Sequence, residues 1–175
     1  MTKQPLKISE DPINYWEQIE QLDRLIRAAE LKAGLIFSFH SLFIGIVIDK
    51  AAELVDFMGE SIFYKSAILV WFLLVVVSLY FALKCFRPKM EMSYDKNAFF
   101  FMDANRAFGD IKGFRKAFRT INQDPDELYG QLAEQIYIQS KIIDYKFSTV
   151  QRSIKFLFGS FIWLLVLVTF YLIIA

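Results

Sequence analysis

Four residues in the last third of the chain are spaced so that they could form a hydrogen-bonding surface. Gln135, Gln139, Ile142 and Lys146 recur at intervals of four, three and four residues, and at 100° per residue this places them on one narrow helix face. Two amides and one ammonium group can donate several hydrogen bonds to a small anion or to a nucleobase edge. A solvated helix face has the same pattern, so the spacing alone leaves both interpretations open.

Motifs for catalysis do not appear in the sequence. His40 is the only histidine and Cys85 the only cysteine, which excludes an internal disulfide and a zinc cluster of cysteines. Neither a glycine-rich phosphate loop nor a nucleophile motif occurs. We therefore predict a protein that is not an enzyme and has no cofactor or metal.

The two reactive side chains each allow two interpretations. His40 lies in an apolar stretch, and ionisable groups in membranes usually face a bundle interior or a water path. The alternative is a neutral histidine bonded to a neighbouring helix, with Ser38 or Ser41 as a further partner. Cys85 follows another apolar stretch and is either a lipidation site or an inert thiol.

The composition indicates an integral membrane protein. Of the 175 residues, 55% are hydrophobic and nineteen are Phe, and the mean hydropathy is +0.35, which is typical of membrane chains. Twenty basic and nineteen acidic residues give a net charge of +1, so no basic excess is available to neutralise a nucleic acid polymer. The first thirty residues are polar and charged, which argues against a cleavable signal peptide.

Three apolar stretches, 33–48, 67–83 and 156–175, are expected to cross the membrane. The second and third are uncharged, and the third has the roughly 20 residues that the hydrocarbon core requires. The first is short, and crosses if Lys32 extends its ammonium group to the interface or the bilayer thins locally. We predict an all-α membrane protein with a cytoplasmic N-terminal helix (1–32), two spans joined by a short external loop (33–86), a cytoplasmic helical bundle (87–155) and a third span (156–175).

Start signals mark two of the helices. Asp11-Pro12 and Asp124-Pro125 each combine an N-cap residue with proline at the first helical position. The second signal predicts a helix from 126 to 175 that turns from polar to apolar, and the first predicts a helix that enters the first span without a break. Residues 105–122 are predicted to form a basic amphipathic helix, residues 90–103 an irregular segment, and residues 49–66 a connection.

Lysine and arginine counts predict the orientation in the membrane. Five lie before the first span, two in the first loop and thirteen between Lys84 and Lys155. Because basic residues concentrate on the cytoplasmic side, the N-terminus and residues 84–155 are expected in the cytoplasm. The first loop and the C-terminus are expected outside.

Three motifs in order resemble those of the Pycsar transmembrane effectors. Glu30-Leu31-Lys32-Ala33 opens the first span, and Arg87-Pro88 with Phe99-Phe100-Phe101-Met102-Asp103 follows the second. Gln135-Ile136-Tyr137, Ser140-Lys141-Ile142 and Lys146 resemble the long helix of that family. The resemblance extends from Glu30 to the C-terminus.

This resemblance implies an antiphage defence effector in the bacterial inner membrane. A partner cyclase would make cyclic CMP or cyclic UMP on infection, and the effector would impair the membrane and cause growth arrest or cell death. A homo-oligomer is implied, since three spans from one chain hardly enclose a conduit. The ligand-binding residues that we predict are Lys32, Gln135, Ser140, Lys141 and Lys146, with Phe101 or Tyr145 for stacking.

The predicted ligand-binding residues of the long helix cannot all line one site, because they lie on different helix faces. Ser140 and Lys141 do not share the face of Gln135 and Lys146, so either two protomers contribute or the former pair is structural. An alternative function is a membrane adaptor whose basic helix, 105–122, contacts a soluble partner or anionic lipid headgroups. A transporter component is less well supported, because the second and third spans carry no charge.

Overall fold

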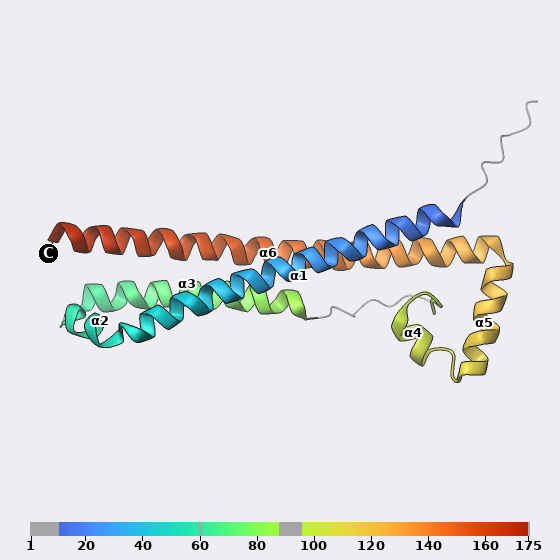
Figure 1. Cartoon of the computed structure of the whole chain (residues 1–175), viewed down its shortest axis with the longest axis horizontal. Coiled ribbons are helices and arrows are strands. Elements are labelled where there is room, and N and C mark those ends of the chain that lie inside the picture. Colours follow the sequence, from blue (N-terminus) through green and yellow to red (C-terminus); the bar gives the residue numbers. More distant parts are fainter. Residues whose placement is uncertain (1–10, 60, 88–95, 175) are drawn as a thin grey trace, which may run out of the picture. The chain divides into compact units, whose positions relative to one another are not determined.

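The computed structural model describes residues 11–59, 61–87 and 96–174. These residues form six α-helices and no strand (Figure 1), which confirms the predicted all-α class. The helices are α1 (Pro12–Asp49), α2 (Ala51–Met58), α3 (Ile62–Phe86), α4 (Phe101–Arg106), α5 (Ile111–Gln123) and α6 (Pro125–Ile174). Helices α1, α3 and α6 are long and apolar enough to cross a membrane, as the sequence predicts.

The chain divides into two compact units. The first unit comprises residues 1–25 and 90–142, and the second comprises residues 26–89 and 143–175. Because α1 and α6 are unbroken helices of 38 and 50 residues, each contributes one part to each unit. The second unit contains the apolar segments, and we call it the membrane unit.

Both predicted start signals are used. The side-chain oxygen Oδ1 of Asp11 accepts a hydrogen bond from the backbone N–H of Ile13 at 2.9 Å. In the same way Asp124 Oδ1 accepts from Asp126 N at 3.1 Å. These carboxylates satisfy backbone donors that have no partner within the first helical turn, so the two long helices begin where the sequence indicates.

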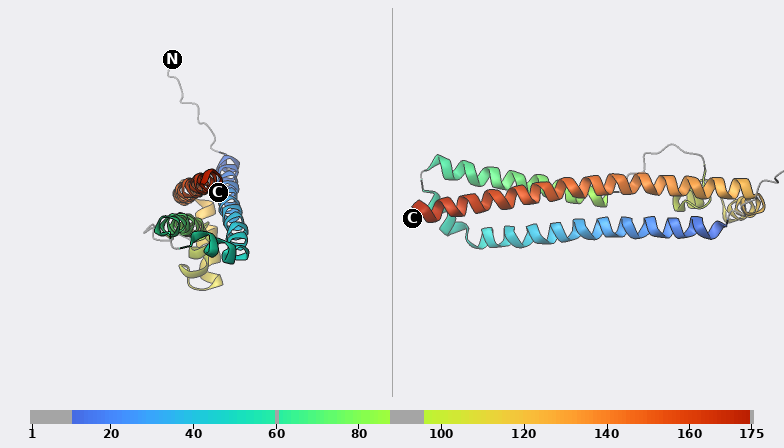
Figure 2. Two further views of the ribbon diagram at one scale, coloured as in Figure 1. Left: turned by 90° about the vertical axis from the view of Figure 1, so that its left-hand side faces the viewer. Right: turned by 90° about the horizontal axis from the view of Figure 1, so that it is seen from above.

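Small residues let the helices of the membrane unit approach closely. In this unit α3 and the second part of α6 lie side by side in all views (Figures 1 and 2). The buried cluster between α1, α3 and α6 consists of Ala29, Ala33, Ile36, Ala82, Cys85 and Val150. Small side chains are common at helix contacts in membranes, because lipid provides no hydrophobic driving force and association depends on close packing.

The region between the second and third spans differs from the prediction. A single helix over 105–122 was expected, but α4 ends at Arg106 and α5 begins at Ile111. The break has a local cause: Gly109 has a φ of 77°, a left-handed conformation that glycine adopts readily. Asp110 then caps α5 by accepting from Gly113 N at 2.7 Å.

Two further segments also differ. The expected connection at 49–66 contains α2 and the first turn of α3, and Phe101 to Asp103 are helical. Residues 1–10, for which a disordered lead is expected, Pro88, where the second span is expected to end, and the first part of the irregular segment (90–95) lie outside the described residues.

The first unit has a core of polar and aromatic contacts. Asn97 is fully buried, and its side chain donates to the backbone oxygen of Gln131 at 2.7 Å. Gln131 Oε1 in turn accepts from Ala98 N at 2.9 Å. Phe99 packs edge-on against Trp16, with ring centroids 5.5 Å apart. These contacts attach the segment before α4 to α1 and α6 within this unit.

Candidate functional site

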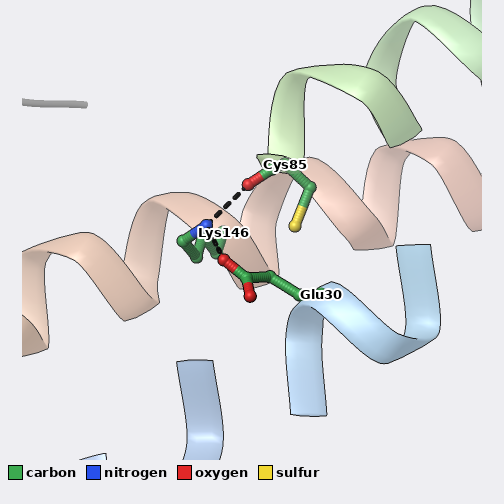
Figure 3. A network of polar contacts seen from close by, with 3 residues as sticks. All are labelled: Glu30, Cys85 and Lys146. Carbon is green, nitrogen blue, oxygen red and sulfur yellow. Dashed lines mark hydrogen bonds and ion pairs between the residues drawn. The ribbon is translucent and has the colours of Figure 1, made fainter. Parts of the chain in front are cut away.

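A buried lysine joins three helices of the membrane unit at one level. Lys146 of α6 is 5% exposed, and its Nζ donates to Glu30 Oε1 of α1 at 2.7 Å. The same Nζ donates to the backbone oxygen of Cys85 in α3, also at 2.7 Å. Figure 3 shows the lysine between its two acceptors. We call these three residues the polar joint.

The position of the joint follows from the chemistry of a helix end. Cys85 lies in the last turn of α3, where backbone carbonyls have no partner within the helix and the helix dipole is negative. An ammonium group satisfies such a carbonyl, and the Glu30 carboxylate balances its charge. Removing Glu30 would leave the buried ammonium group without a counter-charge, and that is more costly than losing the contact itself.

A second polar level lies further along the same helices. Ser78 Oγ of α3 donates to the backbone oxygen of Ser153 in α6 at 2.9 Å, and Ser153 Oγ donates to the backbone oxygen of Ser78 at 2.8 Å. His40 Nε2 of α1 lies 2.8 Å from Ser78 Oγ. A hydroxyl has one proton, and that of Ser78 goes to Ser153, so His40 Nε2 is the donor in its bond. The predicted alternative of a histidine bonded to a neighbouring helix agrees with this arrangement.

The partners expected for His40 are different ones. Ser38 and Ser41 donate to the backbone oxygens of Gly34 and Phe37 in their own helix. Helices α3 and α6 are also joined by Trp163, whose Nε1 donates to the backbone oxygen of Ala67 at 2.9 Å. The pairs 85 with 146, 78 with 153 and 67 with 163 show that α3 and α6 run antiparallel.

Four of the seven predicted ligand-binding residues lie in the first unit. Gln135 is 7% exposed, and its Oε1 is buried without a hydrogen-bond partner among the described residues. Ser140 Oγ donates to the backbone oxygen of Ile136, and Lys141 Nζ lies 5.3 Å from the centroid of the Tyr137 ring. Phe101 is 71% exposed. Gln139, on the same face as Gln135, also has a buried Oε1 without a partner.

The other three lie in the membrane unit. Lys146 belongs to the polar joint, and Lys32 Nζ lies 5.6 Å from the centroid of the Phe147 ring. The ring of Tyr145 lies 5.9 Å from Lys84 Nζ. Thus Lys146 is engaged by protein groups, whereas Lys32 forms no side-chain hydrogen bond or ion pair with the residues that the structure describes.

Several residues of the polar levels were not selected from the sequence. Glu30 belongs to a motif, but the sequence does not show that it is the partner of Lys146. Ser78 is a polar residue within the span 67–83, whereas Ser153 precedes the third span and carries no signal. A polar residue in a span is the signal that could have identified Ser78. Within the described ranges, no group of three or more His, Cys, Asp or Glu side chains could hold a metal ion.

The fold and the buried polar levels define an all-α protein with three membrane-spanning helices. The model of the Pycsar effector protein domain (PycTM) matches residues 14–173, which is nearly the whole chain. The chain therefore belongs to the Pycsar effector family, and it is a transmembrane effector of antiphage defence. No curated protein and no solved structure matches it.

Proposed function

We propose that this effector responds to cyclic CMP or cyclic UMP from a partner cyclase and then impairs the bacterial inner membrane. Infected cells would stop growing or die. The observation that carries the proposal is the polar joint, in which one side chain connects three helices that can span a membrane. Because these contacts fix how the three helices pack, a ligand that favours another packing can shift the arrangement.

The ligand-sensing face is Gln135 and Gln139. Nearly all buried polar atoms in folded proteins have a hydrogen-bond partner, and Gln131, one turn before Gln135 on α6, follows this rule. The buried Oε1 atoms of Gln135 and Gln139 do not. A pyrimidine edge carries N–H groups that can donate to such acceptors, and the exposed ring of Phe101 offers a surface for stacking.

Lys146 then has a coupling role and does not bind ligand, because its ammonium group is already engaged. Gln139 and Lys146 lie seven residues apart on the same unbroken helix, which is about two turns. A cation for the ligand phosphate is available from Lys141 or from a second protomer, so oligomerisation is part of the proposal. The N-terminus and residues 84–155 face the cytoplasm, where a cyclase product is made.

Calorimetric titration of the purified full-length protein with cyclic CMP, cyclic UMP and AMP tests the ligand. The cyclic pyrimidines should bind at least tenfold more tightly than AMP, and the double change Gln135→Leu/Gln139→Leu should abolish this preference. Gln18→Leu replaces an exposed glutamine of the same unit and is the matched control. Equal affinity for AMP and the cyclic pyrimidines would show that the effector does not recognise cyclic CMP or cyclic UMP specifically.

A membrane adaptor is the second candidate, and α5 favours it. Lys112, Arg115, Lys116 and Arg119 lie on its exposed face without an ion pair to any carboxylate that the structure describes. Such a face suits an acidic soluble partner. An adaptor leaves the membrane potential unchanged when it is expressed with an active cyclase, whereas the proposed effector collapses it.

A further inference from the structure

Two cations on the surface of the membrane unit have no anionic partner among the residues that the structure describes. Lys84 follows the uncharged segment 67–83 directly, and Arg152 precedes the segment 156–175 by four residues. Both therefore lie where the apolar part of a span gives way to polar sequence. Among the residues that the structure describes, neither forms an ion pair or a side-chain hydrogen bond.

Aromatic rings position both cations. Lys84 Nζ lies 5.8 Å from the Tyr80 ring centroid and 5.9 Å from that of Tyr145. Arg152 Cζ lies 5.9 Å from the centroid of Phe81, and Phe81 stacks on Phe156 at 5.8 Å with an interplanar angle of 10°. A ring face attracts a cation without neutralising its charge, so both side chains stay available to an anion.

These residues form one seam between two antiparallel helices. Tyr80, Phe81 and Lys84 come from α3, and Tyr145, Arg152 and Phe156 come from α6. Residues 145 and 152 are seven apart and share a helix face, and each contacts the α3 side of the seam. Exposed apolar side chains continue from it along α3: Val76, Tyr80 and Leu83.

We propose that this seam binds the phosphate of an anionic phospholipid such as phosphatidylglycerol. Aromatic and basic residues at the end of a span are the groups that meet lipid headgroups. The two cations attract the single negative charge of the phosphodiester, and the adjacent apolar surface of α3 accommodates the acyl chains. That surface favours a lipid over a free phosphate. The seam does not include Gln135, Gln139 or Phe101, which we propose to contact the nucleotide.

Native mass spectrometry of the full-length protein in detergent, with phosphatidylglycerol and phosphatidylcholine added, tests the site. The wild type should prefer phosphatidylglycerol, and added salt should weaken the preference. Lys84→Gln/Arg152→Gln should lower the affinity for phosphatidylglycerol about 25-fold, or about fivefold for each cation. The affinity for phosphatidylcholine should stay unchanged. The control Lys65→Gln/Lys155→Gln removes the same charge from two exposed positions and should change the affinity less than threefold.

Two further measurements guard against misfolding and against a soluble ligand. Lys84→Arg/Arg152→Lys keeps both charges and should keep the preference. Glycerophosphoglycerol, the headgroup without acyl chains, should bind at least tenfold more weakly than the lipid. Equal losses in both glutamine variants, no preference in the wild type, or equally tight binding of the headgroup would each overturn the proposal.

Discussion

At the scale of single residues, the membrane unit depends on polar side chains that form hydrogen bonds between its helices. Lys146 has two strong acceptors at 2.7 Å, which explains how an ammonium group remains buried beside apolar helices. The two partners differ in exposure, since the Glu30 side chain is 40% exposed and that of Lys146 is 6% exposed. The cost of removing one partner therefore depends on which charge remains.

Glu30→Gln should destabilise the protein more than Lys146→Met. The first change leaves a buried ammonium group without a counter-charge, and should lower the free energy of unfolding by about 2 kcal/mol, below the range for fully buried pairs because water reaches Glu30. The second leaves a carboxylate that water can solvate, and should cost about 1 kcal/mol. Denaturant titration in detergent measures both, and the reverse order would contradict the assigned burial.

Ser78→Ala should destabilise the membrane unit by about 1 kcal/mol, because it removes the donor to Ser153 and the acceptor of His40. Ser66→Ala is the matched control, since the Ser66 hydroxyl is exposed and, among the described residues, bonds only to Phe63 in its own helix. It should change stability by less than about 0.5 kcal/mol. Thermal melts of the two variants make the comparison. Equal shifts in melting temperature would argue against the hydrogen bonds of Ser78 to Ser153 and His40.

At the scale of elements, the backbone before α5 packs closely against its first turn. A Cβ atom added to Gly113 would lie 2.3 Å from the backbone oxygen of Phe108, which is closer than van der Waals contact allows. Gly130 in α6 is exposed, and a Cβ there would meet nothing within 4 Å. The same substitution should therefore have opposite effects at the two positions.

Gly113→Ala should destabilise the first unit by about 1–3 kcal/mol, because the backbone at the start of α5 must shift. Gly130→Ala should stabilise it by about 0.5–1 kcal/mol, because alanine loses less backbone entropy in a helix. Circular dichroism melts of the full-length variants would reveal the difference. Stabilisation by both changes would show that the backbone of Phe108 does not lie this close to Gly113.

The sequence predicts helix starts that depend on neighbouring residues. It does not predict contacts between residues that are far apart in the sequence. Asp11 and Asp124 start helices by bonds to residues two positions away, so these starts could be predicted. The break at Gly109 could not, since glycine is also compatible with a helix. The face of Gln135, Gln139 and Lys146 was identified from its period, but Lys146 meets Glu30 and Cys85, which are 116 and 61 residues away. Spacing along one helix carries no information on such partners.

At the scale of the whole molecule, α6 is the element that both units share. It contains Gln135 and Gln139 in the first unit and Lys146 in the membrane unit, within one unbroken run of helix. If binding at the glutamines alters the polar joint, the helix between them must transmit the change. Asp144 is exposed, and its side chain forms no hydrogen bond or ion pair with the residues that the structure describes. It is therefore a suitable position at which to interrupt the helix.

Asp144→Pro should separate binding from membrane damage. Proline removes the hydrogen bond to the backbone oxygen of Ser140 and clashes with that carbonyl, at a cost of about 3 kcal/mol. The variant should bind cyclic CMP or cyclic UMP within about threefold of wild type, yet release dye from liposomes at least tenfold more slowly. Asp144→Ala removes the same carboxylate but keeps the helix, so it should behave as wild type. Binding and dye release that remain coupled in the proline variant would show that the signal does not travel through this part of α6.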